Sequence, residues 1–178
     1  MTSAEEARQT NPMAQPKLAK VVVNMGIGEG AEKLQKAENL LEALTGQKAV
    51  RTSARKSVRE WGVREGTPIG CKVTLRGEKA VDFLKRALWV RQGRIADWSF
   101  DKQGNLSFGI NDHTDFEGQR YDPSIGVFGL DVAVVLEKPG ARVARRRLMA
   151  GRIPHRHRVT REEAKEFMKS NFTVEVVA

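Results

Sequence analysis

The segment QKAVRTSARKSVREWGVREGTPIGCKVTLRG, residues 47–77, combines a strand pattern with a strong positive charge. It contains eight Lys or Arg residues against two acids, Glu60 and Glu65. Near its end the residues alternate, so that Val73 and Leu75 share one face of a predicted strand and Thr74 lies on the other. One face is suited to a hydrophobic core, and the other offers donors to a polyanion. The pattern predicts a sheet that packs on one side and binds on the other.

The charge of the whole chain is concentrated in two segments. The 178 residues carry 31 Lys and Arg, 22 Asp and Glu, a net charge of +9 and a pI of about 10.0. A second segment, residues 138–161, which we call the basic arm, has nine Lys or Arg and no acid. The two segments hold 17 of the basic residues and 2 of the acids, so the remainder is acidic. Many basic domains bind nothing anionic, but this polarised distribution favours a polyanionic partner.

Cysteine content and hydropathy narrow the class of protein. Cys71 is the single cysteine, so an internal disulfide is excluded and a cytosolic setting is favoured. No apolar run approaches the roughly 20 residues that span a bilayer, and the first residues lack the apolar part of a secretory signal. We therefore expect no membrane partner. Residues 1–16 are predicted to be a flexible lead, and residues 17–178 one domain that includes the basic arm.

The periodicities predict an α+β fold. Strands are expected at residues 18–25, 71–77, 104–111 and 130–137, with an edge strand at the C-terminal end. Helices are expected at residues 31–46 and 78–90 and from Thr160, where Glu163 completes a capping box. In the second helix Val81, Leu84 and Leu88 are expected to face inward. The prediction is a two-layer domain: a mainly antiparallel sheet, helices on one face, and the other face free for a partner.

Other chemistries have weaker signals. Gly26, Gly28 and Gly30 follow a strand and precede a helix, but they do not form G-x-G-x-x-G and no acid follows at the required distance, so a tight turn is preferred to a nucleotide site. The three histidines form no zinc set, and Cys71 lacks a nucleophile motif. Trp89 and Trp98 are predicted to pack in the core. The sequence predicts no metal, cofactor or catalytic residue, and a nucleotide-binding enzyme is the alternative.

The order of motifs resembles the universal ribosomal protein L five family, the 5S-rRNA-binding proteins of the large subunit. The resemblance rests on KVVVNMGIGEG, TGQKAVRTSARKSV and REGTPIGCKVTLRG, with NPM near the start. YDPSIGVFGLDVAVVLEKPG and HRHRVTREEAKEF resemble the archaeal and eukaryotic branch, and the compact chain favours an archaeal one. The resemblance covers nearly the whole chain after its first ten residues. It is far more specific than net charge or any single motif.

The resemblance implies a structural role in the ribosome rather than an enzyme. It implies a sheet that binds 5S rRNA in the central protuberance of the cytoplasmic large subunit. The implied partners also include 23S rRNA, the P-site tRNA, neighbouring central-protuberance proteins and protein S thirteen of the small-subunit head. A free basic regulator of translation or transcription would lack these ribosomal partners.

The family's RNA-contacting pattern falls on Asn24, Gln47, Thr74 and Arg76, whose amide, hydroxyl and guanidinium groups suit base edges, 2′-hydroxyls and phosphates. Trp61 stands where relatives often have phenylalanine, and it can still stack on a base. With the charged residues of both segments, the candidate RNA-binding set is Asn24, Gln47, Arg51, Thr52, Arg55, Lys56, Arg59, Trp61, Arg64, Lys72, Thr74, Arg76, Arg145, Arg146, Arg147, Arg156 and Arg158.

Overall fold

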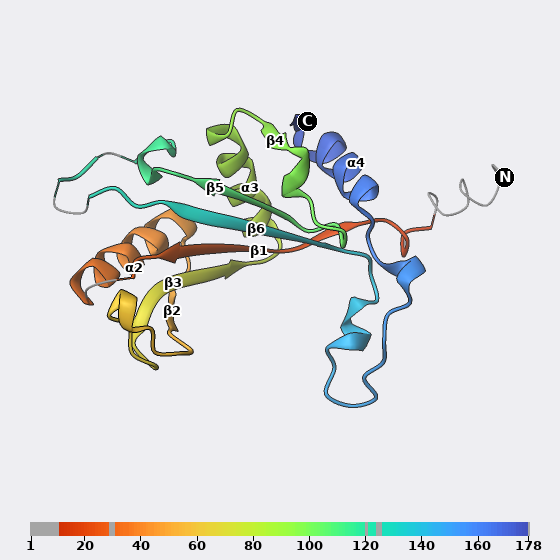
Figure 1. Ribbon diagram of the computed structural model, residues 1–178. Helices are drawn as coiled ribbons and strands as arrows, with labels where there is room; N and C mark the ends of the chain where they lie inside the picture. Colours follow the sequence, from red (N-terminus) through yellow and green to blue (C-terminus); the bar gives the residue numbers. More distant parts are fainter. Residues whose placement is uncertain (1–10, 29–30, 120, 124–125, 178) are drawn as a thin grey trace.

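A five-stranded antiparallel sheet is the centre of the protein (Figure 1). The computed structural model describes residues 11–28, 31–119, 121–123 and 126–177. The sheet has the order β2-β3-β1-β6-β5, with β1 at Lys17–Gly26, β2 at Val50–Ser53, β3 at Pro68–Leu75, β5 at Leu106–Ile110 and β6 at Leu130–Glu137. The helices are α2 (Ala31–Thr45), α3 (Glu78–Val90) and α4 (Arg161–Phe172). The predicted α+β fold with a mainly antiparallel sheet is confirmed.

The register of β1 with its two neighbours gives the sheet one apolar face. Val21 lies opposite Leu75 of β3 and Val134 of β6, and Val23 lies between partners of the same kind. Residues directly opposite in an antiparallel pair point to the same face of the sheet. These side chains are fully or almost fully buried. The alternation in β3 thus continues across the sheet as a single hydrophobic layer.

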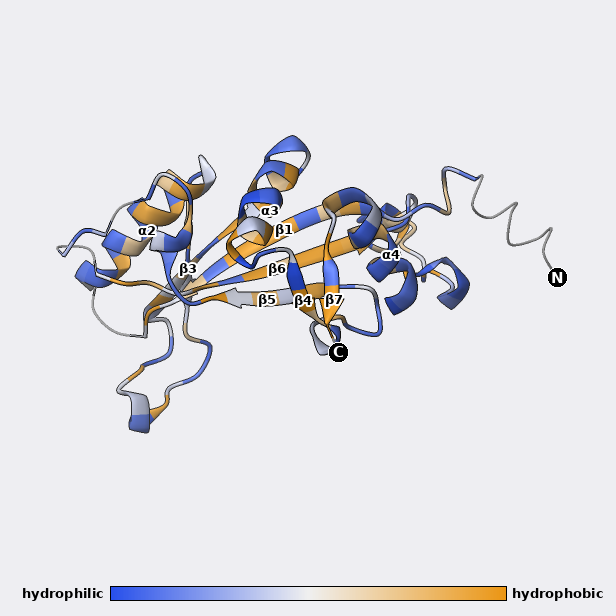
Figure 2. Ribbon diagram, turned by 90° about the horizontal axis from the view of Figure 1, so that it is seen from above, coloured by the Kyte–Doolittle hydropathy of each residue, from blue (hydrophilic) through white to orange (hydrophobic). Residues whose placement is uncertain are grey.

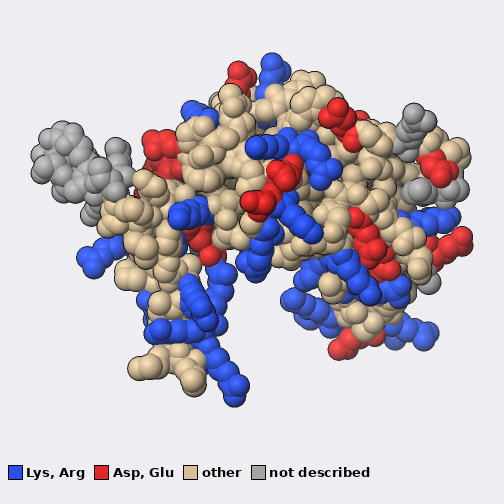
Figure 3. Space-filling model, turned by 180° about the vertical axis from the view of Figure 1, so that it is seen from behind, with Lys and Arg blue, Asp and Glu red and all other residues tan. Residues whose placement is uncertain are grey.

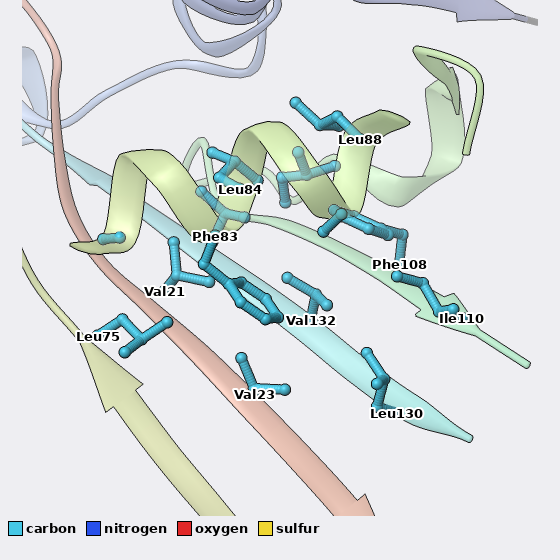
Figure 4. Packing of buried hydrophobic residues seen from close by; sticks show 14 of the residues in the cluster. Val21, Val23, Leu75, Phe83, Leu84, Leu88, Phe108, Ile110, Leu130 and Val132 are labelled. Atoms are coloured by element: carbon cyan, nitrogen blue, oxygen red, sulfur yellow. The ribbon is translucent and has the colours of Figure 1, made fainter. Parts of the chain in front are cut away.

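Helix α3 closes the core over this layer. Its Phe83 side chain points toward the sheet among Val21, Val23 and Val132 (Figure 4). Burying an aromatic side chain of this size contributes about 1.5–3 kcal/mol. Leu84 and Leu88 are buried as the sequence predicted, whereas Val81 is only partly buried. The buried face of α3 is therefore rotated from the predicted stripe toward Phe83. The spacing of the leucines did not indicate this rotation.

Two tryptophans are not core residues. Trp89 and Trp98 are 65% and 81% exposed, so the prediction that they pack in the core is wrong. Trp89 follows the buried Leu88 by one position, which turns it about 100° away from the buried face of α3. Figure 2 shows that hydrophobic residues follow β1 and β6, whereas the helices carry hydrophilic and hydrophobic residues side by side.

The ends of the helices follow the local sequence signals. Thr160 and Glu163 form the predicted capping box at the start of α4. Gly46 follows α2 with a φ of 64°, a left-handed conformation that glycine adopts without strain. The predicted C-terminal strand is β7 (Glu175–Val177), which pairs in parallel with β4 (Arg94–Ala96) as a separate two-stranded sheet. Among the described residues, no helix is long and apolar enough to cross a membrane.

The division of the chain into a lead and one domain stays a prediction. Residues 1–10 of the predicted flexible lead lie outside the described part of the chain. Within the rest of that lead, Asn11 forms a turn in which its side-chain oxygen accepts a hydrogen bond from the backbone N–H of Met13 at 2.9 Å. Apart from Ala54, the buried hydrophobic residues that the structure describes form one continuous cluster.

Candidate nucleic-acid interface

The face of the sheet opposite α2 and α3, which we call the open face, carries polar side chains from its central strands. On β1 and β3, Asn24 lies directly opposite Lys72, and Val22 lies opposite Thr74. Lys72 and Thr74 are exposed, Asn24 and Val22 are half-buried, and the residues between them are buried. Alternation in both strands therefore brings three predicted RNA-binding residues onto one surface.

Small side chains extend the open face toward β5. Ala133 of β6 lies opposite Val22 on one side and Ser107 of β5 on the other. Gly109 of β5 lies opposite Asp131 of β6. Asp131 also lies opposite Asn24 of β1, so it is the acidic residue nearest to Asn24 in the register. Small residues leave the backbone accessible, so a large planar or helical ligand can approach the strands closely. The open face is thus broad and mostly neutral, with Lys72 as the cation at its centre.

Residues 54–67 between β2 and β3, which we call the basic loop, form a second element of the interface. The loop is closed by paired backbone hydrogen bonds between Val58 and Val63. Between them lies a single turn of 3-10 helix, Arg59–Trp61, that ends at Gly62 with a φ of 63°. Trp61 is 71% exposed, so its ring is available for stacking. The exposed cations of this loop are Arg55, Lys56, Arg59 and Arg64.

The basic arm is anchored at its base. Lys138 is 8% exposed, and its ammonium group contacts the carboxylate of Glu163 at 2.7 Å. Glu163 is the same residue that closes the capping box of α4. A ring nitrogen of His157 lies 2.7 Å from the carbonyl oxygen of Pro139, which joins the two ends of the arm. The arm also contains short 3-10 turns at Ala141–Ala144 and His155–His157.

The predicted arginines of the arm have different surroundings. Arg145 pairs with Glu137 at the end of β6. The Nε of Arg146 donates a hydrogen bond to the carbonyl oxygen of Met149 at 2.8 Å. All five predicted arginines of the arm are exposed: Arg145, Arg146, Arg147, Arg156 and Arg158. Their positive charge is therefore accessible to a ligand even where one donor is already used.

The basic loop and the basic arm project in the same direction from opposite ends of the sheet. In Figure 1 both extend below the strands, the loop between β2 and β3 at the left and the arm after β6 at the right. Figure 3 shows, from behind, two projections rich in Lys and Arg with a hollow between them. Two cationic projections about a hollow suit a polyanion that is broad enough to touch both.

Neither Arg51 nor Gln47 is placed on the open face by the strand register. Arg51 pairs with Cys71 in the register and therefore points to the helix side, where its guanidinium donates to the Glu38 carboxylate of α2 at 2.5 and 3.0 Å. That hydrogen bond lowers the pKa of Glu38. Gln47 is half-buried between α2 and β2, and its carbonyl oxygen accepts a hydrogen bond from Thr45 at 3.3 Å. Their RNA contacts stay predictions.

Thr52 and Arg76 lie nearer to the open face. Thr52 pairs with Gly70, which places it on the same side as Lys72, and it is half-buried. Arg76 is exposed directly after β3, two residues beyond Thr74. Lys20 of β1 also shares this side, because it lies two residues from Val22. The sequence reasoning missed Lys20, although its even spacing from Asn24 was a usable signal.

Two further titratable side chains, those of Cys71 and His113, are buried in the structure. Cys71 is fully buried, and burial raises the pKa of its thiol to about 11, so it is a protonated packing residue at neutral pH. His113 is buried and its ring accepts a hydrogen bond from the backbone N–H of Phe128 at 3.3 Å. Among the described residues, no group of three His, Cys, Asp or Glu is placed to hold a metal ion.

Backbone hydrogen bonds hold the described part of the glycine turn after β1. The carbonyl oxygen of Ile69 accepts hydrogen bonds from the N–H groups of both Ile27 and Gly28 at 3.0 Å. Gly28 has a φ of 73°, as a tight turn requires. The third glycine of the motif, Gly30, lies outside the described residues.

Comparison with known proteins gives similarity over nearly the whole chain. Residues 11–64 match the family model described as Ribosomal protein L5, and residues 68–169 match the model for the C-terminus of the same ribosomal family. The large ribosomal subunit protein uL5 of Sulfurisphaera tokodaii is 55% identical over 173 residues, covering 97% of this chain and 98% of that protein. The uL5 protein of Sulfolobus acidocaldarius is 52% identical over 98% of both chains, and that of Thermoplasma acidophilum is 50% identical over 94% and 99%.

Proposed function

Since the chain belongs to the ribosomal protein L5 family, we propose that its particular role is to bind 5S rRNA with the open face and attach it to the large ribosomal subunit. Membership itself makes the chain a structural, non-enzymatic, RNA-binding component of the large subunit, and hence of the cytoplasmic ribosome. The resemblance noted in the sequence, including its archaeal type, is thereby confirmed.

The observation that carries the proposal is the uncovered, polar side of a sheet whose other side packs against α2 and α3. Asn24, Lys72 and Thr74 lie on it as register neighbours, and none of the three is buried. Together they offer an amide, an ammonium and a hydroxyl group within one patch. An amide and a hydroxyl can hydrogen-bond to base edges and 2′-hydroxyls, whereas the ammonium neutralises a phosphate. A folded RNA presents all three kinds of partner on one surface.

The two projections extend the proposal to further RNA. We assign the basic arm to 23S rRNA, because the arm projects away from the sheet and its base is fixed to α4. We assign the basic loop to the P-site tRNA, because Trp61 and four cations are exposed on this one loop. Neighbouring proteins of the central protuberance and protein S thirteen of the small-subunit head complete the proposed partners.

Binding of purified 5S rRNA at a series of salt concentrations tests the proposal. The logarithm of the affinity should fall with the logarithm of the salt concentration by about 0.7–0.9 per phosphate neutralised. Chemical footprinting of 5S rRNA should show protection that weakens when Asn24 and Thr74 are replaced. The matched control replaces Gln35 and Asn39, two neutral polar residues that are exposed on α2. Equal loss of protection in the control would refute the open face as the binding surface.

A further inference from the structure

The tip of the basic arm exposes two large aliphatic side chains. Leu148 is 77% exposed and Met149 is 86% exposed. They follow Arg145, Arg146 and Arg147 directly in the sequence and lie between the two 3-10 turns of the arm. Adjacent apolar side chains at the end of a charged projection gain nothing from the core, and such exposed apolar groups mark interaction sites.

The position of this tip is fixed by the rest of the arm. Lys138 and Glu163 join the base of the arm to α4, and His157 joins its returning segment to Pro139. Farther out, the backbone N–H of Gly151 donates a hydrogen bond to the carbonyl oxygen of Val143 at 3.1 Å. The arm is therefore bridged at two levels, and the tip is held out from the body rather than folded back onto it (Figure 1).

The backbone of the tip is held in an unusual conformation. Met149 has a φ of 51°, in the left-handed region that residues other than glycine seldom adopt. The guanidinium of Arg146 donates to the Met149 carbonyl oxygen at 2.8 Å and so supports this conformation. Backbone strain of this kind persists where the surrounding structure enforces it and is concentrated at functional positions. Here it is located at the most exposed large hydrophobic residue of the described chain.

We propose that Leu148 and Met149 form an apolar wedge that inserts against unstacked bases of large-subunit RNA. Arg145, Arg147 and Arg152 contact the phosphates on either side of the insertion. Apolar wedges between base steps, flanked by cations on the backbone, are an established way for proteins to grip nucleic acid. The inference rests on the proposed RNA-binding function and adds to it a contact that is not electrostatic.

The charge of the arm is what selects RNA as the occupant. No acid occurs in residues 138–161, so every charged residue that flanks the wedge within the arm is a cation. RNA places apolar base faces within a few ångströms of phosphates, and this arrangement complements a wedge with arginines beside it. An acidic protein with an apolar pocket is the competing occupant, and the experiment distinguishes the two.

The test uses the full chain with Leu148→Ser and Met149→Ser combined, and purified 5S and 23S rRNA as separate probes. We expect the affinity for one of these RNAs to fall about ten- to a hundredfold, since two aliphatic side chains are no longer buried against bases, while part of the cost of unstacking is no longer incurred. The dependence on salt should stay unchanged, because no charge is removed. Arg145→Gln with Arg147→Gln should instead reduce that dependence. Val177→Ser, an exposed aliphatic residue on β7, is the matched control.

The outcomes separate the wedge from the function on which it rests. If the wild-type protein binds 5S rRNA and the double serine variant binds both RNAs with unchanged affinity, the wedge is refuted and the proposed function stands. If the wild-type protein fails to bind 5S rRNA, the proposed function itself is refuted. If the double variant binds both RNAs normally but no longer assembles into subunits, a protein pocket is the occupant and the wedge is likewise refuted. Thermal melting should be unchanged, because both side chains are exposed.

Discussion

The open face and the basic arm are both surfaces for RNA in our proposal, but they differ in chemistry and in construction. The open face presents mostly neutral groups, such as Asn24 and Thr74, on strands that the core fixes from behind. The basic arm presents arginines on a segment that is held by a few contacts at its base. The first surface is positioned by many packed residues, whereas the second is positioned by a handful of polar bridges.

This difference separates two kinds of recognition. Contacts to phosphates give affinity that depends on salt, and contacts to bases and 2′-hydroxyls give specificity. The open face is suited to the second kind and the arm to the first. Substitutions on the two surfaces should therefore change different measurable quantities, which makes the comparison testable.

The largest expected effect lies behind the open face. Leu75→Ala removes a fully buried side chain of β3 and should lower the free energy of unfolding by about 2–5 kcal/mol. RNA binding should change only through unfolding, as measured by thermal melting together with 5S rRNA affinity. Its neighbour Arg76 is exposed, so Arg76→Ala should do the reverse and lose about 1.5–3 kcal/mol of binding with little change in stability. Destabilisation by Arg76→Ala with normal binding would break the assignment of faces.

The next effect concerns the arm. Replacement of Arg145, Arg146 and Arg147 by Gln should reduce the slope of log affinity against log salt by about 2–3 for large-subunit RNA, because up to three phosphate contacts are lost. Incorporation into subunits should fall while the melting temperature changes little. The control replaces Lys33, Lys79 and Lys169, which are exposed on the three helices. An unchanged slope in the arm variant would show that its charges are only solvated.

A smaller effect is expected on the open face. Asn24→Ala combined with Thr74→Val removes neutral hydrogen-bonding groups, each worth about 0.5–1.5 kcal/mol. The affinity for 5S rRNA should therefore fall by roughly five- to a hundredfold with no change in its salt dependence. Lys72→Gln, opposite Asn24 and two residues before Thr74, should reduce the salt slope by about one. A reduced slope in the neutral double variant would erase the distinction between the two surfaces.

The smallest effect is that of the ion pair on the helix side. The hydrogen bond from Arg51 holds the pKa of Glu38 below its ordinary value, so this pair stabilises the fold above the unfolded pKa of about 4.3 and ceases to do so as the pH falls through the lower folded value. Arg51→Gln should slightly lower the melting temperature at pH 7, and the deficit should shrink as the pH falls below about 4.3. Arg64→Gln, which removes another exposed arginine, is the control for the melting temperature. If Arg51→Gln reduced the salt slope of RNA binding as much as Lys72→Gln does, Arg51 would be shown to contact a phosphate.

The sequence was informative where the signal is local. In β3 every second residue from Cys71 to Leu75 is apolar, so its two faces were predictable. In β1 three consecutive valines obscure the alternation, and only pairing with β3 shows that Val22 belongs to the open face. The capping box of α4 was readable because its partners are three residues apart.

Longer-range contacts were not predictable. The four residues of β2 are too few to show which side Arg51 takes, and its partner Glu38 lies 13 residues earlier in the chain. The anchoring of the arm depends on Lys138 and Glu163, which are 25 residues apart. A charged residue in a basic run is predicted to be solvated, so nothing in the sequence indicated that Lys138 is buried.

The shared role of Glu163 has a consequence for the order in which the protein takes shape during synthesis. This carboxylate both caps α4 and binds Lys138, so the base of the arm can be fixed only after the residues of α4 have left the exit tunnel. Until then the nine cations of residues 138–161 belong to a polycation without a fixed base, and we expect it to bind RNA by charge alone, without selectivity. We expect the segment to become an oriented projection, and its RNA binding to become selective, only once α4 is complete.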